Sequence, residues 1–120
     1  MRSLFRMASR STRLGGVDLY PLGDIAARQP PGGYEIFFDS PSLELGVYVL
    51  MAPEPDGQEP HDRDEVYVVL EGEGVLTVEG NQQRLGPGDA AFVAAGDDHR
   101  FSGYERLVLF VLFDNTTRTG

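Results

Sequence analysis

Short apolar runs separated by turn residues dominate the chain from residue 34 onward. The runs are rich in Val, Leu, Phe and Tyr, and clusters of Gly, Pro and Asp interrupt them at intervals of about 8 to 12 residues. Each run has the length of a strand and is too short for a convincing helix. The pattern therefore predicts an all-β fold with strands at Tyr34–Phe38, Glu44–Met51, Glu65–Glu71, Gly74–Glu79, Gln83–Leu85, Ala90–Ala94 and Arg106–Phe113.

The segments between these strands have the composition of tight turns. Glycines in Glu71–Gly74 and at Gly80 accept the positive φ of hairpin turns, and Gly86–Asp89 places Pro and Gly as a type II turn requires. One short helix is predicted at Asp24–Arg28, ended by the prolines and glycines of residues 30–33. Because many short antiparallel strands must protect their edges, the pattern favours a jelly roll or small barrel over an immunoglobulin sandwich, whose Cys and Trp markers are absent.

Composition narrows the classes of partner. A length of 120 residues fits one domain, and the formal net charge of −9 repels phosphate and anionic lipid headgroups. The longest apolar run, Leu107–Phe113, is far shorter than the roughly 20 residues of a membrane-spanning helix, and the absence of Cys excludes disulfides and thiolate ligands. We expect a soluble, cytoplasmic protein that binds neither nucleic acid nor membrane.

The first 13 residues differ from the rest of the chain. They contain four Arg, three Ser and no acidic residue. This composition resembles an organelle transit peptide, but an over-extended start or a disordered basic arm fits as well, and no apolar core of a secretory signal is present. The use of Arg without Lys is typical of GC-rich bacterial genomes. We expect residues 1–15 to form a disordered basic arm ahead of one domain at residues 16–120.

The two histidines of the chain each lie beside a turn at the start of an apolar strand. Glu59, His61 and Glu65 fall within seven residues, and strand alternation would aim Glu59 and His61 to the same face and Gln58 to the other. A reversal before Glu65 would return its carboxylate to the imidazole, and His99 follows a second turn. Two imidazoles with one or two carboxylates would suit Fe(II), Mn(II), Ni(II) or Zn(II).

Two stretches resemble the paired motifs of the cupin superfamily. PHDRDEVYVVLEGEG is similar to the first, G(X)5HXH(X)3-4E(X)6G, with His61, Glu65 and Gly72 at matching positions. GPGDAAFVAAGDDHRFSG is similar to the second, G(X)5PXG(X)2H(X)3N, with Gly88, Gly96 and His99 at theirs. The resemblance covers a core of about residues 43–113 and implies a double-stranded β-helix, the jelly-roll barrel of cupins.

The chain departs from the cupin pattern at the metal site. Glu59 stands at the position of the first motif His, Ala94 at the Pro and Gly103 at the terminal Asn of the second motif. The resemblance therefore implies a ligand set of Glu59, His61, Glu65 and His99 around one divalent metal. Two carboxylates would favour Mn(II) or Fe(II). A bulge near Pro60 would instead turn Gln58 inward.

The resemblance leaves two classes of function open. One is a metal-dependent enzyme of the dioxygenase, isomerase, epimerase or decarboxylase type, with Tyr67 and Phe101 lining the substrate pocket. The other is a non-catalytic ligand-binding, sensor or structural cupin, whose metal is structural or absent; a barrel that has lost its metal would bind an organic ligand directly. Cupins often dimerise through N-terminal strands, and the apolar strand Tyr34–Phe38 predicts a homodimer.

Overall fold

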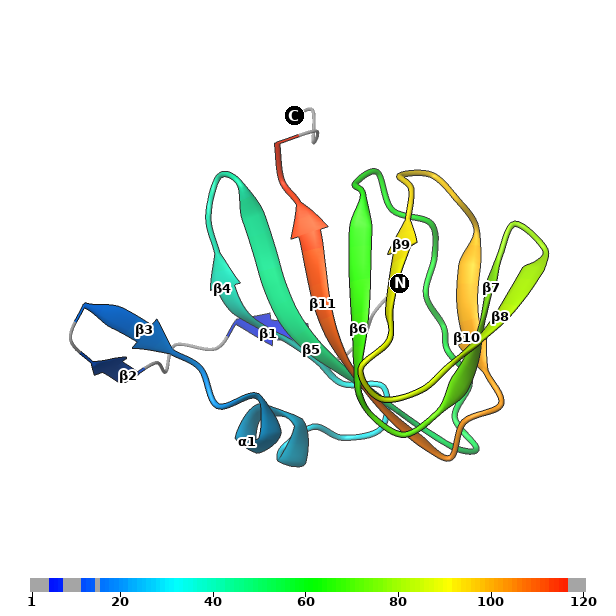
Figure 1. Ribbon diagram of the computed structural model, residues 1–120, viewed down its shortest axis with the longest axis horizontal. Coiled ribbons are helices and arrows are strands. Elements are labelled where there is room, and N and C mark those ends of the chain that lie inside the picture. Colours follow the sequence, from blue (N-terminus) through cyan, green and yellow to red (C-terminus); the bar gives the residue numbers. More distant parts are fainter. Residues whose placement is uncertain (1–4, 8–11, 15, 117–120) are drawn as a thin grey trace.

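The structure, a computed structural model, describes residues 5–7, 12–14 and 16–116 (Figure 1). It contains eleven described strands and one short helix, α1 (Leu22–Ala27). The strands are β1 (Phe5–Met7), β2 (Thr12–Leu14), β3 (Val17–Leu19), β4 (Tyr34–Asp39), β5 (Leu43–Met51), β6 (Glu65–Glu71), β7 (Gly74–Val78), β8 (Asn81–Leu85), β9 (Ala90–Val93), β10 (His99–Ser102) and β11 (Arg106–Asp114).

Two sheets form the walls of a barrel. The larger has the order β1-β4-β5-β11-β6-β9 and the smaller β10-β7-β8, while β2 and β3 form a separate hairpin (Figure 1). Every pairing in the two main sheets is antiparallel except that of β1 with β4. The connection between β5 and β6 lies beside β10, because the Phe101 amide donates to the Asp56 carboxylate at 2.8 Å. The predicted all-β jelly roll is confirmed.

Alternation along the strands sorts side chains into the barrel. Glu65, Tyr67 and Val69 on β6 are buried and point inward, while the residues between them are only partly buried. On β10 the same alternation buries His99 and Phe101. Tyr34, Tyr48, Tyr67, Phe101 and Phe113 belong to one core cluster with the aliphatic side chains between the sheets. The period of two thus places two polar side chains, Glu65 and His99, in the barrel interior beside this apolar cluster.

A second apolar layer covers the outer face of the larger sheet. Ile25 and Ala26 of α1 pack with Phe37 of β4 and Val47 of β5. The predicted helix at Asp24–Arg28 thus exists, displaced to Leu22–Ala27. Strand β4 lies between β1 and β5, so both of its edges are already paired within the chain and neither is open to a strand of a second subunit.

The N-terminal segment is described only in part. Residues 1–4, 8–11 and 15 of the predicted basic arm lie outside the described residues, as do residues 117–120. Within the arm the structure describes β1, which runs parallel to β4, and β2, which pairs with β3. The expectation of a disordered arm at residues 1–15 stays a prediction, because most of these residues lie outside the described ones.

The sequence pattern missed two strands of the main sheets, β1 and β10, as well as the β2–β3 hairpin, and it misplaced one turn. Strand β10, four residues with Phe101 as the only large apolar side chain, carries too little hydrophobic signal to be recognised. In the β7–β8 hairpin Val78 pairs directly with Asn81, so the turn consists of Glu79 and Gly80, both with positive φ, instead of residues 80–82 between the two predicted strands. Strand β8 consequently begins two residues before the predicted Gln83.

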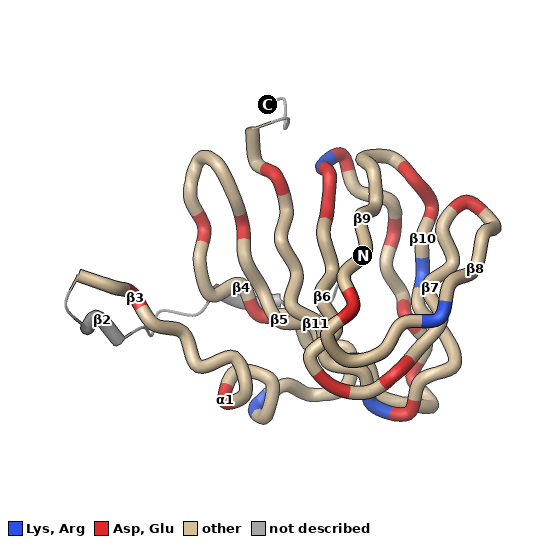
Figure 2. The backbone as a smooth tube through the Cα atoms, in the orientation of Figure 1, with Lys and Arg blue, Asp and Glu red and all other residues tan. Residues whose placement is uncertain are grey.

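Charged positions are spread over the molecule (Figure 2). Acidic residues occur on or beside most strands, whereas the arginines of residues 16–116 lie on separate elements. No helix in the described part of the chain has the length and apolar character needed to cross a membrane.

Gly72 and Gly80 provide a matched test of turn geometry. Both have positive φ, +82° and +84°, but a Cβ on Gly72 would lie 2.0 Å from the Arg106 carbonyl oxygen, whereas one on Gly80 would meet no atom within 4 Å. We expect Gly80→Ala to cost about 1 kcal/mol through backbone strain, and Gly72→Ala to cost at least about 1 kcal/mol more through the clash. Urea unfolding measures both; equal losses would contradict this account.

Candidate metal centre

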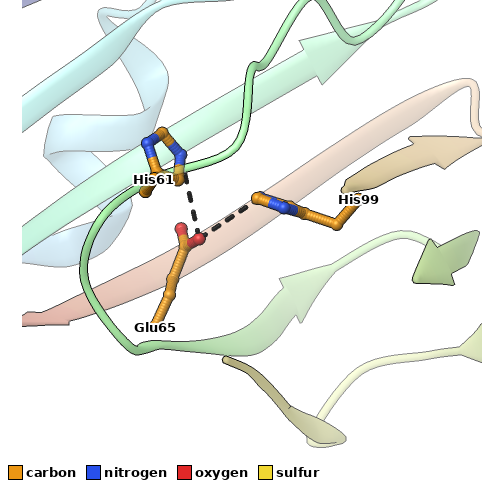
Figure 3. Close-up of side chains that lie close together, drawn as sticks. All are labelled: His61, Glu65 and His99. Atoms are coloured by element: carbon orange, nitrogen blue, oxygen red, sulfur yellow. Dashed lines mark ion pairs between the residues drawn. The ribbon is translucent and has the colours of Figure 1, made fainter. Parts of the chain in front are cut away.

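Three of the predicted ligands converge at one end of the barrel (Figure 3). Glu65 is the first residue of β6, His99 is the first residue of β10, and His61 lies in the connection that leads into β6. The His61 carbonyl accepts a 2.6 Å hydrogen bond from the Gly96 amide, which holds this connection against the turn that precedes β10. Residues far apart in the sequence are thus brought together by neighbouring strands and one backbone contact.

The distances within the cluster suit a shared cation. Glu65 Oε1 lies 3.4 Å from His99 Nε2 and 3.9 Å from His61 Nε2. The two imidazole centroids are 5.4 Å apart, and one ligand atom from each residue lies within 4.8 Å of the others. Two imidazole nitrogens and one carboxylate oxygen form a donor set that Fe(II), Mn(II), Ni(II) and Zn(II) all accept.

The Glu65 carboxylate is buried without a hydrogen-bond donor. Its side chain is 1 % exposed, and neither oxygen has a hydrogen-bond partner among the described residues; the same holds for His99 Nε2. A carboxylate removed from water costs several kcal/mol unless hydrogen bonds or an opposite charge offset the loss. The cluster is therefore incomplete on its own, and a cation between the three side chains would complete it.

The orientation of His99 supports the same conclusion. Its Nδ1 lies 2.9 Å from the Asp97 carbonyl oxygen, so Nδ1 carries the proton that is donated to this oxygen. In the neutral ring the lone pair of Nε2 then faces the Glu65 carboxylate. Metal-binding histidines are commonly held in this way by a carbonyl acceptor behind the ring. A proton or a metal ion can occupy the space between the two electron-pair donors.

The protonation equilibrium of His99 reflects this arrangement. Burial lowers the pKa of His99, but the Glu65 carboxylate, 3.4 Å from its Nε2, and the hydrogen bond to the Asp97 carbonyl raise it. The negative charges of Glu65 and Asp56 raise it further, and the net effect is a pKa above the ordinary value of 6.5. In the absence of metal, a proton on His99 therefore partly compensates the buried charge of Glu65.

Glu59 lies outside the cluster. Its side chain is exposed, and it does not belong to the group whose ligand atoms approach one another. Residues 55–61 form no strand, so the alternation that would aim Glu59 and His61 to one face does not apply. Instead Gln58, the alternative inward residue, is buried: it accepts from the Tyr67 hydroxyl at 2.8 Å and donates to Asp56 at 2.8 Å.

Asp56 is a buried carboxylate that the sequence pattern did not reveal. It is 3 % exposed and accepts hydrogen bonds from the Tyr48 hydroxyl at 2.9 Å, the Gln58 side chain and the Phe101 amide at 2.8 Å. In sequence it looks like a turn residue ahead of Gly57, and no periodic pattern marks it as buried. Unlike Glu65, this carboxylate is satisfied by fixed donors.

The two predicted pocket residues lie beside the cluster inside the barrel. Tyr67 is fully buried and packs edge-on against Phe101, with ring centroids 4.9 Å apart. Burial and the nearby charges of Glu65 and Asp56 raise the pKa of Tyr67 well above its ordinary value, so its hydroxyl stays protonated. A hollow of about 270 Å³ between residues 52–56 and 100–104 is lined by Phe101 but not by Tyr67. The substrate-lining role of both residues remains a prediction.

A two-sheet barrel that carries a His and Glu cluster at one end defines the cupin class of proteins. Residues 47–113 match the sequence family described as "Cupin domain", which is more than half of the chain. The chain therefore belongs to the cupin superfamily, as its two motifs indicated.

Individual relatives agree with this assignment. The uncharacterized protein SCO3923 of Streptomyces coelicolor is 36% identical over 83 residues, which are 68% of this chain and 79% of that protein. A cupin superfamily protein from Desulfitobacterium hafniense DCB-2 matches with a TM-score of 0.69 at 22% identity. The match covers 88% of this chain and 98% of that protein, and at this identity it supports a shared fold only.

One similar structure is an enzyme. The DMSP lyase DddQ from Ruegeria pomeroyi DSS-3 is 31% identical, with a TM-score of 0.60, and the match covers 68% of this chain. The chain spans only 42% of the length of DddQ.

The buried pair predicts a pH-dependent stability of the metal-free protein. Because the folded-state pKa of His99 is raised above 6.5, its contribution is fully present below that value and is lost as the pH rises through the raised pKa. Glu65→Gln removes the charge responsible. We expect the free energy of unfolding of the wild type minus that of the variant to fall as the pH rises from 6.5 through the raised pKa of His99. Urea titrations in EDTA measure this, and a difference independent of pH would refute it.

Proposed function

We propose that this cupin binds one divalent transition metal through His61, Glu65 and His99 and uses it to bind a small organic molecule. The observation that carries the proposal is the Glu65 carboxylate, 1 % exposed and without a hydrogen-bond donor among the described residues, facing two imidazole nitrogens. No other feature at this end of the barrel neutralises that charge: among residues 16–116 no arginine lies within 4.0 Å of it.

Three protein ligands leave coordination positions for water or a substrate. A set of two His and one carboxylate with open positions is typical of catalytic sites, whereas structural zinc is closed by four protein ligands. When bound, such a metal supplies Lewis-acid activation or, if it is iron, oxygen chemistry. The preference for Mn(II) or Fe(II) depended on Glu59 as a second carboxylate, so the three-residue set suits Mn, Fe, Ni and Zn alike.

The residues around the cluster support its function by position and charge. The Asp97 carbonyl fixes the ring of His99 through Nδ1. The protonated Tyr67 hydroxyl donates to Gln58, which in turn donates to Asp56, so the polar side chains behind Glu65 are held by one another. Isomerase or oxygenase chemistry is the proposed type of reaction, and the similarity to DddQ adds lyase chemistry with DMSP as a first substrate to assay.

Metal content tests the proposal. Untagged protein purified without added metal is expected to contain about one divalent ion per chain by elemental analysis, and Glu65→Ala and His99→Ala are expected to lose it. Glu59→Ala should keep its ion, because Glu59 is exposed and outside the cluster. Glu73→Ala, at an exposed ion pair with Arg84, is the control for surface-charge removal. Metal-free wild-type protein would refute the proposal and favour a non-catalytic cupin that binds its ligand directly.

We also propose that the protein is a homodimer. The described surface exposes three large apolar side chains, Val17, Leu19 and Phe92, of which Phe92 on the edge strand β9 is 62 % exposed. Light scattering at micromolar concentration is expected to give about twice the monomer mass of 13.2 kDa. A single species at the monomer mass would reject the dimer.

A further inference from the structure

Arg63 is a largely buried arginine between two of the candidate ligands. It follows His61 by two residues and precedes Glu65 by two, and its side chain is 13 % exposed. One guanidinium nitrogen, Nη1, donates to Glu44 Oε1 at 2.9 Å and to Asn115 Oδ1 at 2.9 Å. These contacts fasten the connection before β6 to the start of β5 and to the residue that follows β11.

The partners of Arg63 are themselves held in place. The second oxygen of Glu44 accepts from the Tyr34 hydroxyl at 2.7 Å, so this carboxylate is shared by an arginine and a tyrosine. The Asn115 amide donates to the Ser40 carbonyl at 2.7 Å in the β4–β5 turn. The guanidinium is therefore anchored to a network of fixed acceptors and is not a side chain that moves freely in solvent.

Phe113 connects Arg63 to the metal centre. The guanidinium carbon lies 4.2 Å from the centroid of the Phe113 ring, within the range of a cation–π contact. The same ring packs edge-to-face with the imidazole of His61, with centroids 4.9 Å apart. Phe113 is fully buried and pairs with Glu65 across β11 and β6. Arg63 and His61 thus contact one rigid aromatic ring.

His61 needs such support more than the other two ligands. Glu65 and His99 are the first residues of strands and are 1 % exposed, whereas His61 lies in a segment without regular structure and is 17 % exposed. Outside a strand, the backbone of His61 is held by single hydrogen bonds such as the one from the Gly96 amide, so the orientation of the imidazole depends more on what the ring contacts. Residues that orient a metal ligand from behind commonly contribute 10- to 100-fold to metal affinity.

We propose that Arg63 is a positioning residue for His61, acting through Phe113 and through the ion pair with Glu44. This inference rests on the proposed function of the centre as a metal site. Arg63 is not itself a ligand, since a guanidinium has no lone pair to offer. Its effect is to hold the His61 imidazole toward Glu65, so that the site is formed before the ion arrives.

Metal affinity of Arg63 variants tests the proposal. Arg63→Met keeps an unbranched apolar stem but loses the charge, the fork of donors and the stacking, and we expect it to weaken Mn²⁺ or Zn²⁺ binding by about 10-fold or more in calorimetric titrations. Arg63→Lys keeps the charge near Glu44 but not the planar guanidinium, so its metal affinity should lie between those of the wild type and Arg63→Met. Arg84→Met, which removes an exposed ion pair with Glu73, is the matched control and should bind metal as the wild type does.

The imidazole signals of the metal-free protein separate positioning from general destabilisation. The untagged chain has only two histidines, so its NMR spectrum contains one set of imidazole ring signals for His61 and one for His99. The spectrum of the His61→Gln variant assigns the two sets. We expect Arg63→Met to shift and broaden the signals of His61 and to leave those of His99 in place. If Arg63→Met does not fold, Arg63→Lys is tested in its place by the same metal titration and the same histidine ring signals.

Each outcome bears on one proposal. Wild-type protein that binds no metal refutes the metal-site function itself, whatever the variants do. Wild-type protein that binds metal, together with an Arg63 variant that binds it equally well, refutes the positioning role. Equal disturbance of both histidines would also refute that role, because it would show that Arg63 stabilises the barrel as a whole and does not act on His61.

Discussion

The structure depends on one unfavourable group, the Glu65 carboxylate, which lies in the barrel interior without a hydrogen-bond donor among the described residues. Isolated buried charges are avoided in folded proteins, because the desolvation cost exceeds what apolar packing returns at the same position. Glu65 faces Nε2 of both imidazoles, and in the neutral ring of His99 this nitrogen is an acceptor, because Nδ1 donates to the Asp97 carbonyl. Only a cation or an added proton satisfies all three side chains at once. This requirement turns a group of neighbouring side chains into a candidate binding site.

Asp56 shows that burial alone does not create such a site. Both carboxylates lie inside the barrel, but Asp56 accepts hydrogen bonds from a hydroxyl, a side-chain amide and a backbone amide, so its charge is stabilised by fixed dipoles. The Gln58 amide connects this carboxylate to Tyr67, whose ring lies near that of His99. Asp56 therefore stabilises the architecture behind the centre, whereas Glu65 is left available for a metal ion.

The sequence predicted the fold well because strand alternation and turn glycines are local signals. The strands that begin at Tyr34, Glu65 and Arg106 were located to within a residue at each end. Strand β10 was missed because its pairing partner β7, and not its own composition, defines it. His61, Glu65 and His99 followed from motif spacing. Whether residue 58 or 59 faces inward depends on the irregular path of residues 55–61, which no periodicity encodes.

The exposed edge of the cluster limits how a ligand can reach it. Tyr67 and Phe101 are fully packed and Glu65 and His99 are 1 % exposed, so approach from the barrel core would require displacing several large side chains. His61, 17 % exposed, is the member of the cluster that contacts solvent. A small molecule would therefore reach a bound ion past His61, and the residue that must stay accessible is also the one outside any strand. The Arg63, Glu44 and Phe113 contacts address this conflict, because Phe113 packs edge-to-face with the His61 ring and is itself packed against the anchored guanidinium of Arg63.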